Sequence, residues 1–263
     1  MSELKFLHIS DLHYLIDSSK LEKQWKNNYS YKEVMKDFLE SLDYSDIDFV
    51  AITGDLTNDG DTQDYEELYT FLSTTIPKTI PVHMTLGNHD YKEQFKKVFN
   101  PRVESILNYS VTYQGYRLIF LDSSSEDFHH GRISEQQFEW LQNEMKEPSE
   151  KGTLIFQHHP YEIVWNDVSQ RTEVPNDYYD FLREQDEIIG IFCGHLHQSR
   201  QSTVCKIPQY TVAPLSIGIT EVGNTLYQSN RLGYNSVRVR DQDIDVMSEI
   251  ILPEQNLYWP GVI

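Results

Sequence analysis

The chain has 263 residues, of which 39% are hydrophobic, and a formal net charge of −19, which disfavours a protein that tracks along duplex nucleic acid by phosphate contacts. No stretch approaches the roughly 20 apolar residues that span a membrane, and the start MSELKFLHIS lacks the pattern of a secretory signal. We therefore expect a cytoplasmic protein with no membrane partner, in which Cys193 and Cys205 are reduced thiols or form at most one bridge.

Two sequence patterns alternate along the chain. Short apolar runs that end at turn residues predict strands over 4–10, 48–56, 81–90, 109–124 (a hairpin), 153–160 and 187–197. Apolar residues at helical spacing predict helices over 31–42, 64–75, 91–99, 134–145 and 176–185. Ser134 and Gln137 have the spacing of a capping box, and Asn176 is the predicted cap of the last helix.

This alternation predicts a layered α/β (α+β) fold in one domain over 1–263, because no repeat, low-complexity tract or linker divides the chain. From Arg200 onward the tail, 200–263, is predicted to form strands that complete the second sheet; whether it also covers the site or forms a dimer contact is left open, as is the oligomeric state. Segments 121–133 and 160–175 are irregular and follow strand ends, which is typical of active-site loops.

Five short motifs stand at the carboxyl ends of predicted strands, the edge where open α/β sheets build their sites. In chain order they are DLH (Asp11, His13), GD (Asp55), GNHD (87–90), HHP (158–160) and GHLH (His195, His197). Because alternate side chains of an extended chain point to the same side, the members of each i, i+2 pair are expected to converge.

The chemistry of these motifs favours metal ions. Carboxylate, amide oxygen and imidazole are ligands for borderline divalent ions such as Mn, Fe, Co or Zn, and no thiolate of a structural zinc site is among them. Seven such groups exceed the needs of one ion, whereas two ions that share a carboxylate would use them all and would support in-line attack of a bridging hydroxide at phosphorus. Bound ions would also give this acidic chain the positive charge that an anionic substrate needs.

Taken singly, each motif is common. A lone Asp at a strand end is more often a turn or cap residue, GD after an apolar strand is ordinary turn chemistry, and HH or HxH is often a surface or structural pair. These interpretations do not explain five such motifs in a fixed order, each at a strand end.

The set resembles the calcineurin-like metallophosphoesterase superfamily, whose pattern is DxH, GDxx, GNHD/E, a His before a Pro, and GHxH. The resemblance covers the chain from Asp11 to His197, and HGRISEQQFEWLQNEM (130–145) is similar to a segment of the class III cyclic-nucleotide phosphodiesterase branch. It implies a four-layer α-β-β-α sandwich of two mixed sheets flanked by helices. It also implies two metal sites, one held by Asp11, His13 and His197, the other by Asn88, His158 and His195, with Asp55 bridging both.

The resemblance also implies roles for neighbouring residues. His89 matches the non-ligand histidine that stabilises transition-state charge or protonates the leaving oxygen, and His159 is a neighbour of the ligand His158. Asn58 stands where protein phosphatases carry an Asp that orients this histidine, and Asp59 and Asp90 are candidates to compensate.

The same positions indicate a substrate class. Asp59 replaces an Arg with which protein phosphatases bind a dianionic monoester, Asn58 replaces the metal-binding Tyr of purple acid phosphatases, and His89 stands where the lipid-A precursor hydrolases usually have Arg. The nuclease branch normally adds a long capping domain. A small anionic phosphodiester remains, with a cyclic nucleotide as the first expectation.

Several alternatives stay open. Besides a phosphodiesterase, the chain could be a broad phosphomonoesterase or, from a different class, a catalytically silent protein-binding scaffold of the same fold. Arg132 and Arg171, in the irregular loops, are candidates to approach substrate or are solvated surface residues. Aromatic residues that could stack on a base, or pack in the core, are Tyr161, Trp165, Tyr178 and Tyr179.

Overall fold

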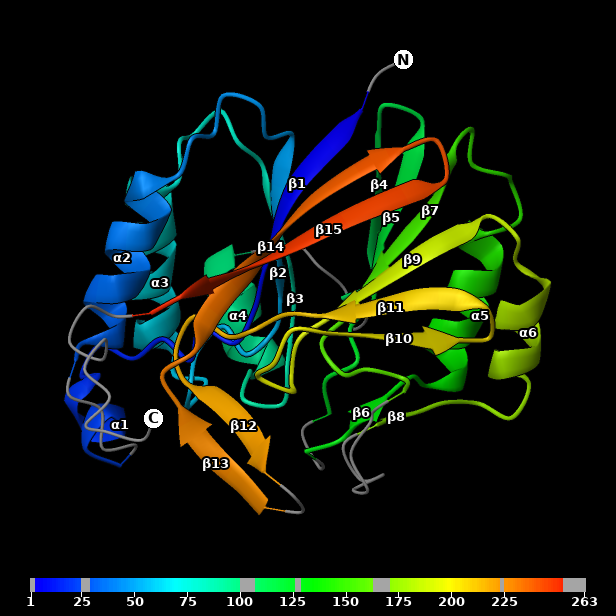
Figure 1. The fold of residues 1–263 in the computed structure, drawn as a ribbon. Helices are drawn as coiled ribbons and strands as arrows, with labels where there is room; N and C mark the ends of the chain where they lie inside the picture. Colours follow the sequence, from blue (N-terminus) through cyan, green and yellow to red (C-terminus); the bar gives the residue numbers. More distant parts are fainter. Residues whose placement is uncertain are drawn as a thin grey trace.

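The computed structural model describes residues 3–24, 29–99, 107–125, 129–162, 171–222 and 225–252. Two large mixed sheets lie against each other (Figure 1). The first has the order β15-β14-β1-β2-β3, with β1 Leu4–Ile9, β2 Phe49–Thr53, β3 Val82–Thr85, β14 Leu232–Arg240 and β15 Asp243–Ile251. The second has the order β10-β11-β9-β7-β5-β4, with β4 Tyr109–Tyr113, β5 Tyr116–Phe120, β7 Gly152–Phe156, β9 Ile188–Cys193, β10 Arg200–Val204 and β11 Ile207–Thr211.

The central strands are buried on both faces, which explains their continuous apolar runs. In β2, Val50 and Ile52 pack toward the helices, while Phe49 and Ala51 pack toward the other sheet. Phenylalanine rings fill the space between the sheets, with Phe6 stacked on Phe49 at 4.8 Å and edge-on to Phe156 of β7 at 5.5 Å.

Helices cover the outer face of each sheet. Those that pack on the first sheet include α2 Tyr31–Ser41 and α3 Thr62–Thr75, and those on the second are α5 Glu135–Glu144 and α6 Tyr178–Glu184. The three apolar layers, one between the sheets and one under each set of helices, confirm the predicted four-layer sandwich. Two further helices are α1 Ser19–Gln24, which was not predicted, and α4 Lys92–Phe99.

The helix ends test the predicted caps. The Ser134 hydroxyl accepts from Gln137 N and the Gln137 side chain accepts from Ser134 N, so the capping box is confirmed. The prediction for α6 is wrong, because its N-cap is Asp177 and that side chain makes no capping bond. The first turn is fixed instead by the backbone, where Tyr178 N–H donates to Pro175 O at 3.1 Å.

The tail is shared between the sheets, which corrects the expectation that it completes only the second. Strands β10 and β11 do extend the second sheet, but β14 pairs antiparallel with β1 and carries β15 at the edge of the first. Between them β12 Gly218–Val222 and β13 Thr225–Ser229 form a hairpin that pairs with neither large sheet (Figure 1). In the irregular loops a two-residue pairing joins β6 Gly131–Arg132 to β8 Thr172–Glu173.

Parallel pairing determines where the loops meet. β1, β2 and β3 run in one direction, as do β5, β7, β9 and β11, so each set ends at one edge of its sheet. The two edges are joined beyond the strands, since the His158 ring donates from Nδ1 to Thr53 O at 2.7 Å. All five motifs therefore lie at one end of the sandwich.

Candidate metal centre

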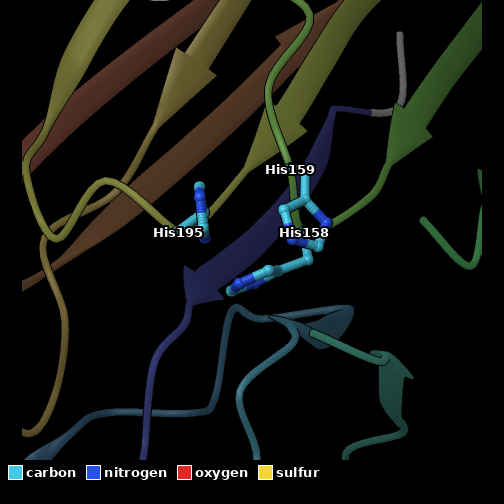
Figure 2. Close-up of side chains that lie close together, drawn as sticks. All are labelled: His158, His159 and His195. Atoms are coloured by element: carbon cyan, nitrogen blue, oxygen red, sulfur yellow. The ribbon is translucent and has the colours of Figure 1, made fainter. Parts of the chain in front are cut away.

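Two groups of potential metal ligands lie at this end of the sandwich. One contains Asp11, His13, Asp55 and His197, and the other contains His158, His159 and His195, with the ligand atoms of each group within 4.8 Å of one another. Figure 2 shows the second group, with His158 and His159 on the segment after β7 and His195 on the segment after β9.

Asp55 joins the two groups. Its Oδ2 atom lies 3.5 Å from His13 Nε2 in the first group and 3.3 Å from His158 Nε2 in the second. On the other side of the first group, His197 Nε2 lies 3.3 Å from Asp11 Oδ1 and 3.3 Å from His13 Nε2. A single carboxylate oxygen thus faces ligand atoms of both groups, as a bridging ligand must.

The backbone at the ligands differs from the extended chain that we expected. Five candidate ligands have positive φ angles: Asp11 (54°), His13 (43°), Asp55 (48°), His195 (69°) and His197 (52°). The strands have ended before these residues, and the loops after β1 and β2 are held together by bonds from Asp11 N–H to Gly54 O and from His13 N–H to Asp55 O. Each left-handed residue costs roughly 1–2 kcal/mol, and such strain is concentrated at functional sites.

Glycine allows the loops to approach this closely. Gly54 has a φ of +85°, and a Cβ there would lie 2.6 Å from His158 Nδ1. A Cβ on Gly194 would lie 1.9 Å from Ser10 Oγ and 2.8 Å from Asp11 Oδ2. The G of GD and the G of GHLH therefore give space to the ligands themselves.

Hydrogen bonds orient three of the imidazoles toward the centre. Carbonyl oxygens only accept, so the Nδ1 atoms of His158 and His197 carry protons that are donated to Thr53 O at 2.7 Å and Ile217 O at 2.5 Å. His13 Nδ1 lies 3.1 Å from Asn58 Oδ1, which is also only an acceptor. In each ring Nδ1 is thereby bound to the protein and Nε2 remains as the atom that can bind a metal ion, the usual arrangement around histidine ligands.

The electrostatics of the centre suit cations. Burial lowers the pKa of His13 and of His195 to about 3, so both rings are neutral at physiological pH. Burial opposes the charge of Asp11, but the adjacent His197 lowers its pKa to about 2. Burial likewise opposes protonation of His158, yet the Asp55 carboxylate raises the pKa of His158 to about 9. Ionised carboxylates are thus buried among imidazoles, and a metal ion would displace the proton that His158 holds.

Asn88 supplies a test of the fit to metal ions. Its Oδ1 atom is buried and has no hydrogen-bond partner in the described part of the chain. His158 Nε2 is buried too and faces the Asp55 carboxylate at 3.3 Å. Leaving a buried polar atom unpaired costs about 1–3 kcal/mol. A buried amide oxygen without a donor is an atom that a cation can bind, so the Asn88 side chain fits the predicted second metal site.

His89 is oriented differently from the expectation. Its Nδ1 donates to the backbone oxygen of Asn58 at 2.8 Å, while the Asn58 side chain serves His13. Asp59 accepts from Asn58 Nδ2 at 2.6 Å and so fixes that amide. Residue 58 therefore holds both histidines, one through its side chain and one through its carbonyl oxygen.

Asp90 binds main-chain groups and a tyrosine hydroxyl, and none of these bonds goes to His89. Its carboxylate accepts from the backbone N–H groups of Leu56, Thr57 and Gly87 and from the Tyr65 hydroxyl, all within 3.1 Å. These bonds tie the GD loop to the GNHD loop. Asp90 is buried, with 5% of its surface exposed.

His159 lies beside the ligands, but both of its ring nitrogens have protein partners. Nδ1 lies 2.9 Å from Ser123 Oγ, and Nε2 donates to His129 O at 3.1 Å. Since His159 N–H donates to Ser123 Oγ, that hydroxyl is free to give its own proton to Nδ1. This arrangement supports the expectation that His159 is a neighbour of the ligands.

The other loop candidates are placed as follows. Arg171 pairs with Glu162 at 3.2 Å, and Arg132 is exposed. Tyr161 and Tyr178 are fully buried with their hydroxyls 2.5 Å apart, so they pack in the core, whereas Trp165 lies outside the described residues.

No helix of the described chain is long and apolar enough to cross a membrane.

Comparison with known proteins agrees with this geometry. The family model Calcineurin-like phosphoesterase matches residues 4–199. A probable cyclic nucleotide phosphodiesterase of Rhodococcus erythropolis is 29% identical over 90% of this chain and 80% of its own length. A glycerophosphodiester phosphodiesterase of Enterobacter lignolyticus is 25% identical over 76% of this chain and 75% of its own.

A dimetal phosphatase from Danio rerio has the same fold, with a TM-score of 0.62 at 14% identity over 93% of this chain and 98% of that one. The family model covers most of the chain and all five motifs, and the enzyme class that the motifs predicted, a metal-dependent hydrolase of phosphoric esters, is confirmed with it. The chain belongs to the calcineurin-like phosphoesterase family.

Proposed function

We propose that the chain is a dinuclear-metal-dependent phosphodiesterase that hydrolyses a small phosphodiester, with a cyclic nucleotide as the first candidate. The observation that carries the proposal is the Asp55 carboxylate, which faces His13 in one ligand group and His158 in the other. Asp11, His13 and His197 would hold one ion, Asn88, His158 and His195 the other, and Asp55 both. When bound, two divalent ions supply charge neutralisation and an activated water for attack at phosphorus.

The chain's own residues then position the reaction. His89 commits Nδ1–H to Asn58 O, which leaves Nε2 as the atom that can meet the substrate. A protonated Nε2 can donate to a non-bridging or leaving oxygen, the role of a general acid. The bond from His89 N–H to Asp55 Oδ1 at 2.9 Å keeps this ring next to the carboxylate that both ions would share.

The diester is favoured over the monoester by charge. A dianionic monoester needs more positive charge at the site than a monoanionic diester does. Where protein phosphatases have an Arg this chain has Asp59, whose carboxylate accepts a hydrogen bond from the Asn58 amide. Two relatives in the comparison carry names of phosphodiesterases, one for cyclic nucleotides and one for glycerophosphodiesters. The second name makes a glycerophosphodiester the alternative diester to test.

The first experiment compares initial rates on bis(p-nitrophenyl) phosphate and p-nitrophenyl phosphate, using apo-protein reloaded with Mn²⁺. We expect the diester to be preferred and EDTA to stop both reactions. Preference for the monoester would replace the proposal with a phosphomonoesterase. No turnover with Mn²⁺, Fe²⁺, Co²⁺ or Zn²⁺, together with substoichiometric metal, would indicate the scaffold. A panel of cyclic nucleotides and glycerophosphodiesters then separates the two diester classes.

A further inference from the structure

A pocket adjoins the metal centre. It is a cavity of about 270 Å³ between the segment after β9, the hairpin strand β12 and the loop before β14, and His197 is one of its walls. The neighbouring wall is bonded to that ligand, since Ile219 N–H of β12 donates to His197 O at 3.3 Å. A substrate held at the metal centre would therefore have this pocket beside it.

The lining is rich in donors and holds two cations. Arg200 and Arg231 both line the pocket, with Gln198, Ser199 and Thr220, and none of the described residues that line it is acidic. In a chain with a net charge of −19 this is an unusual local composition. A guanidinium binds phosphate through two parallel hydrogen bonds, so Arg231 at the wall of this pocket favours an anion.

The side-chain amide of Gln198 adds a buried hydrogen-bond donor that has no acceptor among the described residues. Its backbone oxygen accepts from Thr211 Oγ1 at 2.7 Å, and its side-chain Oε1 accepts from Arg200 Nε at 2.7 Å. Because Arg200 can only donate, this contact fixes which end of the amide is oxygen. The Nε2 group is then left buried with no hydrogen-bond partner among the described residues, at the wall of the pocket. An anion bound in the pocket would supply the acceptor that Gln198 Nε2 lacks.

We propose that this pocket, lined by Gln198, Arg200 and Arg231, binds a second phosphate group of the substrate, next to the scissile one. The proposal rests on the proposed phosphodiesterase function and narrows its substrate to diesters that carry a further phosphate. Among cyclic nucleotides these are the cyclic dinucleotides, which have two phosphates, and not the mononucleotides, which have one. Arg231 forms no ion pair with a described residue, so its charge is not already neutralised there.

The test uses two esters that differ by one phosphate: thymidine 5′-(p-nitrophenyl phosphate) and its 3′-phosphate derivative. Release of p-nitrophenolate is followed with the Mn²⁺-loaded protein. We expect kcat/KM to be higher for the 3′-phosphorylated ester by about tenfold, the value of one charge-assisted hydrogen bond. The ratio of the two values should fall toward one in Arg231→Gln and in Gln198→Leu. It should be unchanged in Arg238→Gln, which removes an exposed arginine of β14 that does not line the pocket.

A ratio near one in the wild type, or the same ratio in wild type and Arg231→Gln, would overturn the proposal. Because each ratio is taken within one variant, differences in metal content or folded fraction cancel. If neither ester is cleaved, the phosphodiesterase function fails, and calorimetry still decides the pocket. Thymidine 3′,5′-bisphosphate should then bind the wild type about tenfold more tightly than thymidine 5′-monophosphate, and Arg231→Gln should abolish that difference. Equal affinities in the wild type would reject the pocket.

Discussion

The side-chain oxygen of Asn58 lies 3.1 Å from Nδ1 of His13, and the backbone oxygen of the same residue lies 2.8 Å from Nδ1 of His89. One residue thus orients a metal ligand through its side chain and the proposed general acid through its main chain. A substitution at position 58 should affect the first histidine and leave the carbonyl bond to the second in place.

We predict that Asn58→Ala lowers metal affinity about 10–100-fold, the usual effect of removing the partner of a histidine ligand. Asn58→Asp keeps an acceptor for His13 Nδ1–H and should bind metal at least as tightly as the wild type. Mn²⁺ titration calorimetry of the three proteins measures this. Equal affinity of the alanine variant and the wild type would show that His13 needs no partner.

The shared carboxylate makes the second prediction. Asp55→Asn should abolish turnover and reduce the metal content below one ion per chain, because the Asp55 carboxylate is proposed to bind both ions. Elemental analysis after reloading gives the metal content, and circular dichroism checks the fold. Wild-type rates in this variant would contradict the two-metal proposal.

Much of this centre could be predicted because its signals are local. Apolar runs buried on both faces marked the strands, and the motif residues follow those strands directly in sequence. The four-layer order came from the family resemblance and was confirmed by the three apolar layers. The assignment of individual ligands stays a prediction that the variants above test.

What the sequence could not show depends on contacts between distant segments. The left-handed backbone at Asp11 and His13 arises from bonds to the loop after β2, more than 40 residues away in the chain. The carbonyl oxygens of Thr53 and Ile217, which orient His158 and His197, have no signal in residue type, since every residue has a carbonyl. Alternation predicts strands and not their partners, so the sequence places the tail in one sheet where the structure divides it between two.

Two adjacent histidines provide the third prediction. His158→Asn should lose metal from one site, since Nε2 of that ring faces Asp55. His159→Gln should retain both ions, because its ring binds Ser123 and His129, but should lose about 1–3 kcal/mol of unfolding free energy from broken buried bonds. Metal analysis and urea unfolding of both variants separate the roles. Loss of an ion in the His159 variant would make that residue a ligand.

His8 is the basis of the fourth prediction, which concerns pH. This ring is fully buried between the sheets, its Nε2 lies 2.9 Å from Thr53 Oγ1, and Asn235 Nδ2 lies 3.3 Å from its Nδ1. Burial lowers the pKa of His8 to about 3, against about 6.5 in the unfolded chain. The unfolded state therefore binds the extra proton below pH 6.5, and the contribution of His8 to stability is complete above that pH and declines as the pH falls toward 3.

The measurement is urea unfolding of the metal-free wild type and of His8→Gln between pH 7 and pH 3. This substitution removes the titrating ring and keeps a hydrogen-bond donor and an acceptor. The wild type should be the more stable protein at pH 7, and its advantage should shrink by at most about 1.4 kcal/mol per pH unit between pH 6.5 and 3. Taking the difference between the two proteins cancels the titration of the other buried histidines, which both share. An advantage that does not change with pH would mean that the folded protein accommodates a charged ring at this position, contrary to the burial of His8 between two sheets.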